Sequence, residues 1–206
     1  MRYLIVCGGK IDKEFGLNEI KTDGIDAIIA ADSGMDFLYE NGVTPDIIVG
    51  DFDSATTKAL EFFERKGQTE IHRLNPIKDD TDSEAALHLA FEKTKGDIFL
   101  LGGTGTRLDH VLGNIAILGQ GFVQDRHIFL LDEHNRIRLI QKECRIKKEE
   151  QYGKYVSVVS FCGVARGVSE SGVFYPLDHV DLQPFTSLGI SNAVSYTHLR
   201  AHETCA

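Results

Sequence analysis

Five short apolar runs alternate with helical segments over the first 120 or so residues, and this alternation constrains the fold more than any other feature. The runs are YLIVCGG (3–9), AIIAADSG (27–34), DIIVGDFDS (46–54), TEIHRLN (69–75) and DIFLLGG (97–103). Each run stops at polar or glycine residues, as the buried strands of parallel sheets do. Such βαβ repetition predicts an α/β fold with an N-terminal, mainly parallel, doubly wound sheet and helices on both faces.

Two of the intervening helices have clear boundary signals. The segment ATTKALEFFERKG can be capped by Ser54 and ends at Gly67. The segment TDSEAALHLAFEKTKG opens with a capping box from Thr81 to Glu84 and runs to Gly96.

The chain changes character after residue 128. RHIFLLDEHNRIRLIQ is typical of two strands around an Asp-Glu-His-Asn turn, and KYVSVVSFCG and SGVFYPL continue the β pattern with no convincing helix. The sequence therefore predicts an α/β domain over 1–128 and a second, smaller all-β C-terminal domain over 129–206.

Charge and hydropathy limit the classes of partner that the chain is expected to bind. A formal charge of −9 opposes nucleic-acid binding, and there is no polybasic patch or bilayer-length apolar stretch for a membrane. The N-terminal apolar run is too short for a signal peptide, so a cytoplasmic protein with small-molecule partners is expected. The four scattered cysteines, Cys7, Cys144, Cys162 and Cys205, are interpreted as free thiols.

Polar clusters follow all five predicted strands. They are Gly8 and Gly9; Asp32, Ser33 and Gly34; Asp51 and Asp53; Asp79, Asp80 and Asp82; and Gly102 through His110. Ligands of open parallel sheets bind outside the carboxyl ends of the strands, so these clusters are expected to converge on one edge. Taken singly, Asp51 and Asp53 are also ordinary turn and cap residues. Crowded carboxylates repel one another unless a cation neutralises them, which favours a Mg²⁺ and phosphate site.

The segment LGGTGTRLDH (101–110) supplies complementary groups. Its glycines let backbone amides approach phosphate oxygens, the following helix offers its positive end, and Arg107 adds a planar cation. The P-loop spacing is absent, and Leu108 stands where the dinucleotide motif needs its third glycine. Asp109 and His110 can also be read as plain first-turn helix residues.

Three motifs in this order and spacing, GDFDS, DDTDSEAA and GGTGTRLDHVLGN, resemble the signature of bacterial thiamine pyrophosphokinases. The resemblance extends from the opening GG through ADSG to TSLGISN (186–192), and it covers roughly residues 1–192. It implies an enzyme that transfers a pyrophosphoryl group from ATP to thiamine with Mg²⁺, giving thiamine diphosphate and AMP.

The resemblance also implies site residues. The acidic group that holds Mg²⁺ and orients the hydroxyl is Asp51, Asp53, Asp79 and Asp82, with ligand and base not divided, and Arg107 joins it as a catalytic residue. The ATP-binding residues are Asp32, Ser33, Gly102, Gly103, Thr104, Arg107, Asp109, His110 and Asn114. The family implies a homodimer in which Ser187, Ser191 and Asn192 bind thiamine from the partner chain.

Several individual roles stay open. Asp109 either fixes Arg107 or contacts the nucleotide, and His110 is as much a structural histidine as a catalytic one. Asn114 is expected to bind phosphate, Ser33 to contact the nucleotide through its backbone amide, and Asp82 is alternatively only a cap.

Two other functions account for part of the pattern. A metal-dependent sugar-nucleotide transferase also uses a DxD-like pair, which Asp51 and Asp53 match, but that function leaves DDTD and GGTGTRLDH unexplained. A non-catalytic nucleotide-sensing module needs fewer carboxylates.

The final segment, 193–206, departs from the family pattern. The family usually continues with Glu after Asn192 and then with a further strand, whereas this chain reads AVSYTHLRAHETCA and resembles a translated cloning adapter. His198, Arg200 and His202 fall at even spacing, but no sustained alternation follows. A foreign tail is therefore expected to lack the terminal strand and to leave a sheet edge unpaired.

Overall fold

The computed structural model describes residues 2–53, 55–77, 79–105, 107–195 and 198–202. The chain divides into two compact units between Leu139 and Ile140. This division falls eleven residues after the boundary expected from sequence, 128/129. The two units are described separately.

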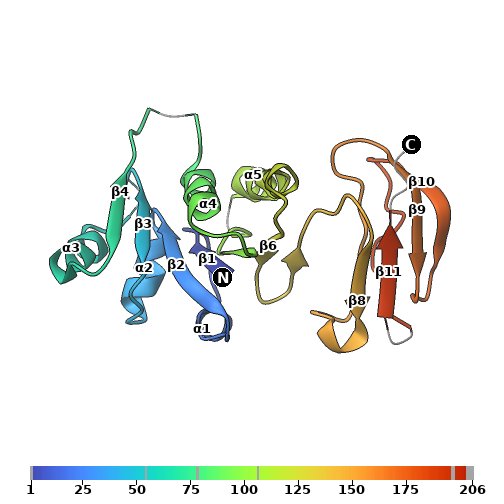
Figure 1. Cartoon of the computed structure of the whole chain (residues 1–206), viewed down its shortest axis with the longest axis horizontal. Helices are drawn as coiled ribbons and strands as arrows, with labels where there is room; N and C mark the ends of the chain where they lie inside the picture. Colours follow the sequence, from blue (N-terminus) through green and yellow to red (C-terminus); the bar gives the residue numbers. More distant parts are fainter. Residues whose placement is uncertain (1, 54, 78, 106, 196–197, 203–206) are drawn as a thin grey trace. The chain divides into compact units, whose positions relative to one another are not determined.

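The first unit is built on a seven-stranded sheet (Figure 1). Its strands are β1 (Arg2–Val6), β2 (Ile25–Ala31), β3 (Ile47–Gly50), β4 (Glu70–Arg73), β5 (Ile98–Leu101), β6 (Ile128–Leu131) and β7 (Arg136–Ile137), in the order β4-β3-β2-β1-β5-β6-β7. The first six strands are parallel, and β7 is antiparallel to β6. The order reverses between β1 and β5, so this is the switch point of a doubly wound sheet. The predicted fold class is confirmed.

The boundary differs from expectation because of β6 and β7. Both strands around the Asp-Glu-His-Asn turn form as predicted, but they pair with the large sheet. Leu130 lies opposite Ile137 in this hairpin, which extends the edge of the sheet beyond β5. Assigning this hairpin to the all-β domain was wrong, because a tight hairpin adds its second strand beside its first.

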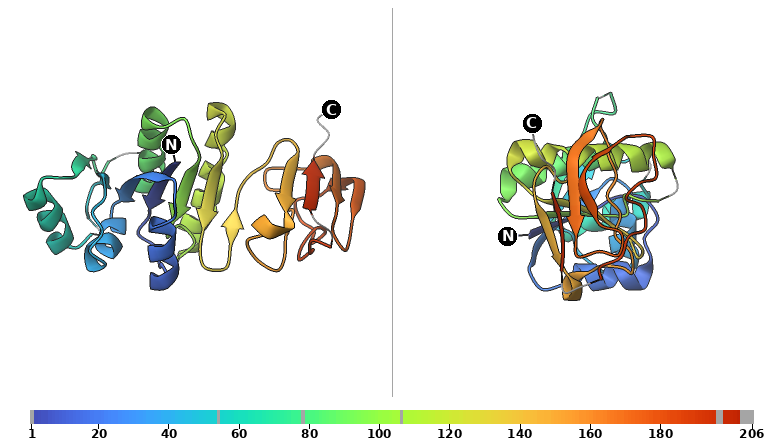
Figure 2. Two further views of the ribbon diagram at one scale, coloured as in Figure 1. Left: turned by 60° about the horizontal axis from the view of Figure 1, so that its bottom comes forward. Right: turned by 90° about the vertical axis from the view of Figure 1, so that its right-hand side faces the viewer.

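Helices cover both faces of the sheet. Their bounds are α1 (Lys13–Ile20), α2 (Gly34–Glu40), α3 (Thr57–Lys66), α4 (Asp82–Lys93), α5 (Leu108–Ile117) and α6 (Gln120–Gln124). Alternate strand residues point to opposite faces: Ile5 and Ile29 pack with α4 and α5, whereas Leu4 and Ile48 pack with α1, α2 and α3. Figure 2 shows the two helix layers on opposite sides of the sheet. Every helix in the described ranges is too short or too polar to cross a bilayer.

The helix boundary signals largely hold. Gly67 ends α3 in the left-handed conformation with a φ of 64°, and the Thr81 hydroxyl accepts the Glu84 N–H at 3.2 Å. Helix α4 ends at Lys93, before the glycine expected to stop it. The predicted cap Ser54 lies outside the described residues.

The second unit is a four-stranded antiparallel sheet. Its elements are β8 (Cys144–Lys147), the 3₁₀ turn η1 (Lys148–Glu150), β9 (Ala165–Ser171), β10 (Leu177–Leu182) and β11 (His198–His202), with strand order β10-β9-β11-β8. The all-β character of this unit is confirmed, but its strands lie at other positions in the sequence than those expected. In the described chain KYVSVVSFCG contributes only an isolated bridge at Val156, and SGVFYPL mostly connects β9 to β10.

The tail supplies a strand, contrary to expectation. Strand β11 pairs with both β8 and β9, so it is internal to the small sheet. Ala201 is 2% exposed and packs with Val173 and Val194. A strand of only five alternating residues forms here, because β8 and β9 flank it and satisfy the hydrogen-bonding groups of its backbone. Cys7, Cys144 and Cys162 are free thiols as predicted, and Cys205 lies outside the described residues.

Placing a charge on β11 tests this strand. Ala201→Asp is expected to lower the thermal midpoint of the second unit markedly, because a carboxylate without a partner would replace a buried methyl group. Val159→Asp, at a position 56% exposed, is the matched control and should change the midpoint little. Equal midpoints for the two variants, measured by circular dichroism, would contradict the placement of β11.

Candidate active site

The loops after β1 and β5 meet at the switch point. Their pairing continues past the strands, because the Cys7 N–H donates to the Leu101 carbonyl at 2.8 Å and the Gly9 N–H donates to the Gly102 carbonyl at 3.0 Å. Gly102 has a φ of +74°, and a Cβ there would lie 2.6 Å from the Cys7 carbonyl oxygen. Glycine is therefore required where the two loops cross.

Three carboxylates gather beside these loops. Asp32 follows β2, and Asp51 and Asp53 follow β3; one oxygen from each lies within 4.8 Å of the others. The β3 loop turns sharply, since Phe52 has a φ of 64° and the Asp53 N–H donates to Asp51 Oδ1 at 3.2 Å. Asp32 itself has a φ of 45°, a conformation that Asp tolerates better than most residues. The chain thus brings three acids together through two strained turns.

The clustered negative charges of these three carboxylates favour the binding of a cation. Asp32 is 6% exposed, and its Oδ1 has no hydrogen-bond partner among the described residues. Burial raises the pKa of Asp32, and the nearby charges of Asp82, Asp51 and Asp53 raise it further. Hard oxygen ligands crowded in this way fit Mg²⁺, so the donor set is compatible with the metal expected from sequence.

The three clustered carboxylates include one residue that the sequence analysis assigned to ATP. Asp32, expected to contact ATP, lies with Asp51 and Asp53, because the Asp32 N–H pairs with the Val49 carbonyl of β3 at 2.8 Å. Asp82 is close enough to influence Asp32 from the start of α4. Asp79 is exposed and is not one of the three clustered carboxylates.

One supporting acid was not recognised from the sequence. Asp36 of α2 accepts hydrogen bonds from both the backbone N–H of Thr56, at 3.1 Å, and the Thr56 hydroxyl, at 2.5 Å. Thr56 is the N-cap residue of α3, so these bonds fix the end of the loop that carries Asp51 and Asp53. The two residues are twenty positions apart, so no local sequence pattern predicts their contact.

The glycine loop is held from α5. Asn114 is buried, and its Nδ2 donates to the Gly103 carbonyl at 2.8 Å. This contact supports the loop, and the contact of Asn114 with phosphate stays a prediction.

Arg107 and Asp109 form an ion pair at the first turn of α5. Arg107 Nη2 lies 2.6 Å from Asp109 Oδ2, and Arg107 Nε lies 3.2 Å from Asp109 Oδ1. Both side chains are exposed, and the guanidinium lowers the pKa of Asp109 to about 2. Of the two roles considered for Asp109, the structure shows the contact with Arg107. His110 is exposed, and its backbone N–H donates to Asp109 Oδ1 at 3.0 Å.

Two further groups line the β1 end of the site. Ser33 is the N-cap residue of α2, and its hydroxyl lies so close to Gly8 that a Cβ on Gly8 would collide with it. The Cys7 thiol is buried and accepts a hydrogen bond from the Ser83 hydroxyl at 3.3 Å. Burial raises the pKa of Cys7 to about 11, so this thiol stays protonated and is a poor nucleophile.

The loop 186–192 is fixed within the second unit. The Gly189 carbonyl accepts the Val158 N–H at 3.0 Å, and the Ser191 N–H donates to Ser157 Oγ at 2.9 Å. Ser191 has a φ of +57°, and the side chains of Ser187 and Ser191 are exposed. The loop therefore presents two hydroxyls to the outside of this unit.

Asn192, grouped with these serines from sequence, is placed differently. It is 2% exposed, and its Nδ2 donates to the Tyr175 carbonyl at 2.7 Å and to Glu170 Oε2 at 3.1 Å. Its Oδ1 accepts the backbone N–H groups of Tyr175 and Ala193. The amide is thus engaged inside the unit, where it ties the loop to β9.

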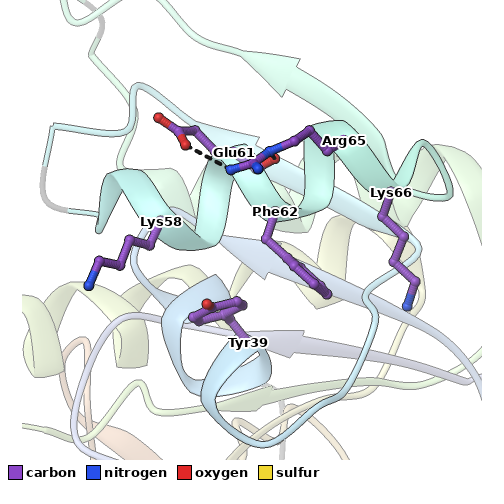
Figure 3. Close-up of a pocket in the computed structure, with 6 residues that line it drawn as sticks. All are labelled: Tyr39, Lys58, Glu61, Phe62, Arg65 and Lys66. Atoms are coloured by element: carbon purple, nitrogen blue, oxygen red, sulfur yellow. Dashed lines mark hydrogen bonds and ion pairs between the residues drawn. The ribbon is translucent and has the colours of Figure 1, made fainter.

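A surface pocket of about 570 Å³ lies elsewhere, on α2 and α3 (Figure 3). It is lined by Tyr39, Lys58, Glu61, Phe62, Arg65 and Lys66. The rings of Tyr39 and Phe62 pack edge to face at 5.2 Å, and Arg65 pairs with Glu61. None of the predicted site residues lines it, so the carboxylates and the glycine loop mark the candidate site.

Comparison with known proteins follows the division into two units. Residues 21–130 match the family described as thiamin pyrophosphokinase, catalytic domain, and residues 143–199 match thiamin pyrophosphokinase, vitamin B1 binding domain. The thiamine pyrophosphokinase of Bacillus subtilis (strain 168) is 34% identical over 170 residues, which are 82% of this chain and 78% of that protein.

Solved structures agree with this similarity. The crystal structure of thiamine pyrophosphokinase from Bacillus subtilis has a TM-score of 0.87 at 30% identity and covers 99% of this chain and 94% of that one. That of thiamin pyrophosphokinase from Geobacillus thermodenitrificans has a TM-score of 0.85 at 26% identity, covering 99% and 93%.

The burial of Asp32 beside other carboxylates predicts a stability effect. Because the folded-state pKa of Asp32 is raised, its ionisation costs stability above the unfolded-state pKa of about 3.9, and the cost vanishes below it. Asp32→Asn should therefore raise the thermal midpoint at pH 7 in EDTA, and the gain should disappear toward pH 3.

The control for this experiment is Asp79→Asn, a change at an exposed carboxylate outside the cluster, which should alter the midpoint little. Added Mg²⁺ should stabilise the unaltered chain more than the Asp32→Asn variant. A variant that is no more stable at pH 7 than the unaltered chain would contradict the cost of ionising Asp32 in its buried, acidic surroundings.

Proposed function

Since the chain belongs to the thiamine pyrophosphokinase family, we propose that it transfers a pyrophosphoryl group from ATP to the hydroxyl of thiamine, giving thiamine diphosphate and AMP. One observation carries the assignment of the site. The carboxylates of Asp32, Asp51 and Asp53 lie together where β2 and β3 end, in the sheet whose switch point carries the glycine loop. This is where an anionic polyphosphate and its counter-ion are expected in such a sheet.

The acidic group would hold the metal. Asp51 and Asp53, with Asp32 and Asp82 beside them, are proposed to hold Mg²⁺. When bound, Mg²⁺ neutralises charge on the phosphates and on the departing oxygen. Asp79 as a metal ligand stays a prediction, because it is not one of the three carboxylates that cluster among the described residues. The choice of Mg²⁺ among divalent cations also stays a prediction.

The phosphates would lie against the glycine loop. The backbone N–H groups of residues 103–105, the N-terminus of the ten-residue helix α5 and the Arg107 guanidinium all offer positive charge or hydrogen-bond donors. Asp109 orients Arg107 through two hydrogen bonds. The Ser33 backbone amide, at the start of α2, is proposed to contact the nucleotide from the β1 side.

The reaction needs positioning more than covalent chemistry. The thiamine hydroxyl oxygen forms a bond to the β-phosphorus, the bond from that phosphorus to the oxygen bridging to the α-phosphorus breaks, and AMP leaves. One carboxylate of the acidic group accepts the hydroxyl proton. A protonated, buried Cys7 is consistent with direct transfer that uses no enzyme nucleophile.

The second unit is proposed to bind thiamine. Ser187 and Ser191 present hydroxyls on the 186–192 loop, and exposed apolar residues of the same unit include Phe174, Phe185 and Leu188. We propose that two chains pair so that this loop serves the α/β unit of its partner. Sedimentation at the mass of a single chain in the presence of both substrates would contradict the homodimer. The cytoplasmic location expected from sequence stays a prediction.

A product assay tests the function. Incubation with ATP, thiamine and Mg²⁺ should release AMP and thiamine diphosphate in equal amounts. Formation of ADP with thiamine monophosphate would show transfer of a single phosphoryl group and contradict the proposal. Binding of ATP with no turnover would favour a sensing module, and turnover only with a sugar nucleotide would favour the transferase alternative.

The glycine loop predicts a kinetic effect. Arg107→Lys keeps the charge but loses the planar fork, so kcat/KM for ATP should fall about tenfold, and Arg107→Ala should lower it further. Arg65→Lys on α3, where the arginine pairs only with Glu61 in the contacts described, is the matched control and should leave the kinetics unchanged. Normal ATP kinetics in Arg107→Ala would remove Arg107 from the site.

A further inference from the structure

Glu170 occupies a core position of the small sheet. Strand β9 lies between β10 and β11, and Glu170 is opposite Leu177 on one side and Ala201 on the other. Val168 and Glu170 are buried two positions apart on this strand, so they share the face that packs inward. A glutamate is rarely buried in this way unless it has a partner. The reaction proposed above makes no use of this carboxyl group, so its burial has another cause.

The partner of Glu170 is the side-chain amide of Asn192. Glu170 Oε2 accepts a hydrogen bond from Asn192 Nδ2 at 3.1 Å, and both side chains are almost fully buried. Glu170 Oε1 has no hydrogen-bond partner among the described residues. Burial raises the pKa of Glu170, and the hydrogen bond from Asn192 opposes this shift. Asn192 therefore supplies a hydrogen bond that stabilises the buried carboxyl group.

The Asn192 side chain extends a short backbone pairing. The segments around Val173 and Val194 pair antiparallel through one bridge. Beyond this bridge the Asn192 side chain pairs with the backbone of Tyr175: Asn192 Oδ1 accepts the Tyr175 N–H at 3.1 Å, and Asn192 Nδ2 donates to the Tyr175 carbonyl at 2.7 Å. The amide thus takes the place that a strand backbone would have in a regular ladder.

The backbone contacts of this amide determine which end of it faces Glu170. The oxygen accepts the N–H groups of Tyr175 and Ala193, and the nitrogen donates one proton to the Tyr175 carbonyl. An amide nitrogen carries two protons, so the second proton is the one donated to Glu170. All four hydrogen-bonding positions of the Asn192 amide are therefore filled. If Glu170 lost its carboxyl group, a buried amide proton of Asn192 would lose its acceptor, which is unfavourable.

Asn192 in turn holds the backbone of the 186–192 loop. Its carbonyl accepts the Val156 N–H at 2.8 Å, and the residue before it, Ser191, donates its N–H to Ser157 Oγ at 2.9 Å. Ser191 has a φ of +57°, which is uncommon for serine and persists only where the surroundings hold it. Ser191 and Asn192 share a peptide group, so the anchor of Asn192 restricts the backbone that carries the Ser191 hydroxyl.

We propose that Glu170 is a positioning residue for thiamine, which acts by holding the Asn192 amide in one orientation and thereby keeps the Ser191 hydroxyl in place. The inference rests on the proposed function, because it takes the 186–192 loop as the thiamine site. Glu170 is 1% exposed, so it acts through Asn192 and not by contact with a ligand at the surface. A loop that is ordered before binding holds its ligand more tightly than a loop that must be ordered on binding.

Two substitutions at Glu170 test the hydrogen bond. Glu170→Leu removes the acceptor and keeps a side chain of similar bulk, so the thiamine KM should rise about threefold to tenfold, with kcat and the ATP KM unchanged. Glu170→Gln keeps an acceptor for Asn192 and should restore the thiamine KM of the unaltered chain. Glu149→Leu, the same change at an exposed glutamate of η1, is the matched control and should leave both KM values unchanged.

A double-mutant cycle tests whether Glu170 acts through Asn192. Asn192→Ala removes the amide, so adding Glu170→Leu to this variant should raise the thiamine KM no further. If Glu170→Leu does not fold, Glu170→Met replaces it, since its unbranched side chain follows the shape of glutamate. Effects of the two substitutions that multiply, a Glu170→Gln variant as impaired as Glu170→Leu, or an unchanged thiamine KM in Glu170→Leu would overturn the inference. An equal rise in the ATP KM would overturn it as well.

Direct calorimetric titration of the full chain with thiamine keeps the two proposals distinguishable, because it needs no turnover. If the unaltered chain binds thiamine but forms no thiamine diphosphate, the proposed reaction fails, and the thiamine Kd of the same variants decides the inference. If the unaltered chain binds no thiamine, with or without Mg²⁺ and a non-hydrolysable ATP analogue, the thiamine site itself is overturned, and the inference is overturned with it.

Discussion

The reversal of strand order between β1 and β5 is the constraint on which the site depends. At this point the chain runs outward in both directions across the sheet, so the loops after the two central strands have no helix crossing between them. The backbone bonds from Cys7 to Leu101 and from Gly9 to Gly102 bring these loops into contact. The glycine loop is available to a ligand because the sheet topology leaves its edge open.

Burial of an ionisable carboxylate beside other carboxylates is the cost of this arrangement. Asp32 is buried, one of its oxygens lacks a hydrogen-bond partner within the part of the chain that the structure describes, and the nearby charges of Asp82, Asp51 and Asp53 are negative. The fold tolerates this because the sheet beneath is well packed: Ile5, Ile29 and Val49 on one face and Leu4 and Ile48 on the other are almost fully buried. Hydrophobic burial in these strands offsets the unfavourable electrostatics at their ends, which a bound cation would relieve.

Much of the site could be predicted because its signals are local. Asp51 and Asp53 follow an apolar strand, the glycines of 102–105 follow another, and such positions meet at one edge whenever the strands are parallel. The partners of these residues could not be predicted in the same way. Asp36 reaches Thr56, Asn114 reaches Gly103, and Asn192 turns inward to Glu170 through contacts that depend on packing.

The sequence by itself determined the α/β class, the all-β character of the C-terminal part, and the loops that carry the acidic and glycine motifs. Apolar periodicity and turn residues set these features over short distances. Only the tertiary structure decided that β7 joins the large sheet, that β11 forms between β8 and β9, and that Asp32 joins the acidic cluster. Strand partners and clustered charges are set by which distant segments pack side by side, and a pattern that repeats every two or four residues carries no information about that choice.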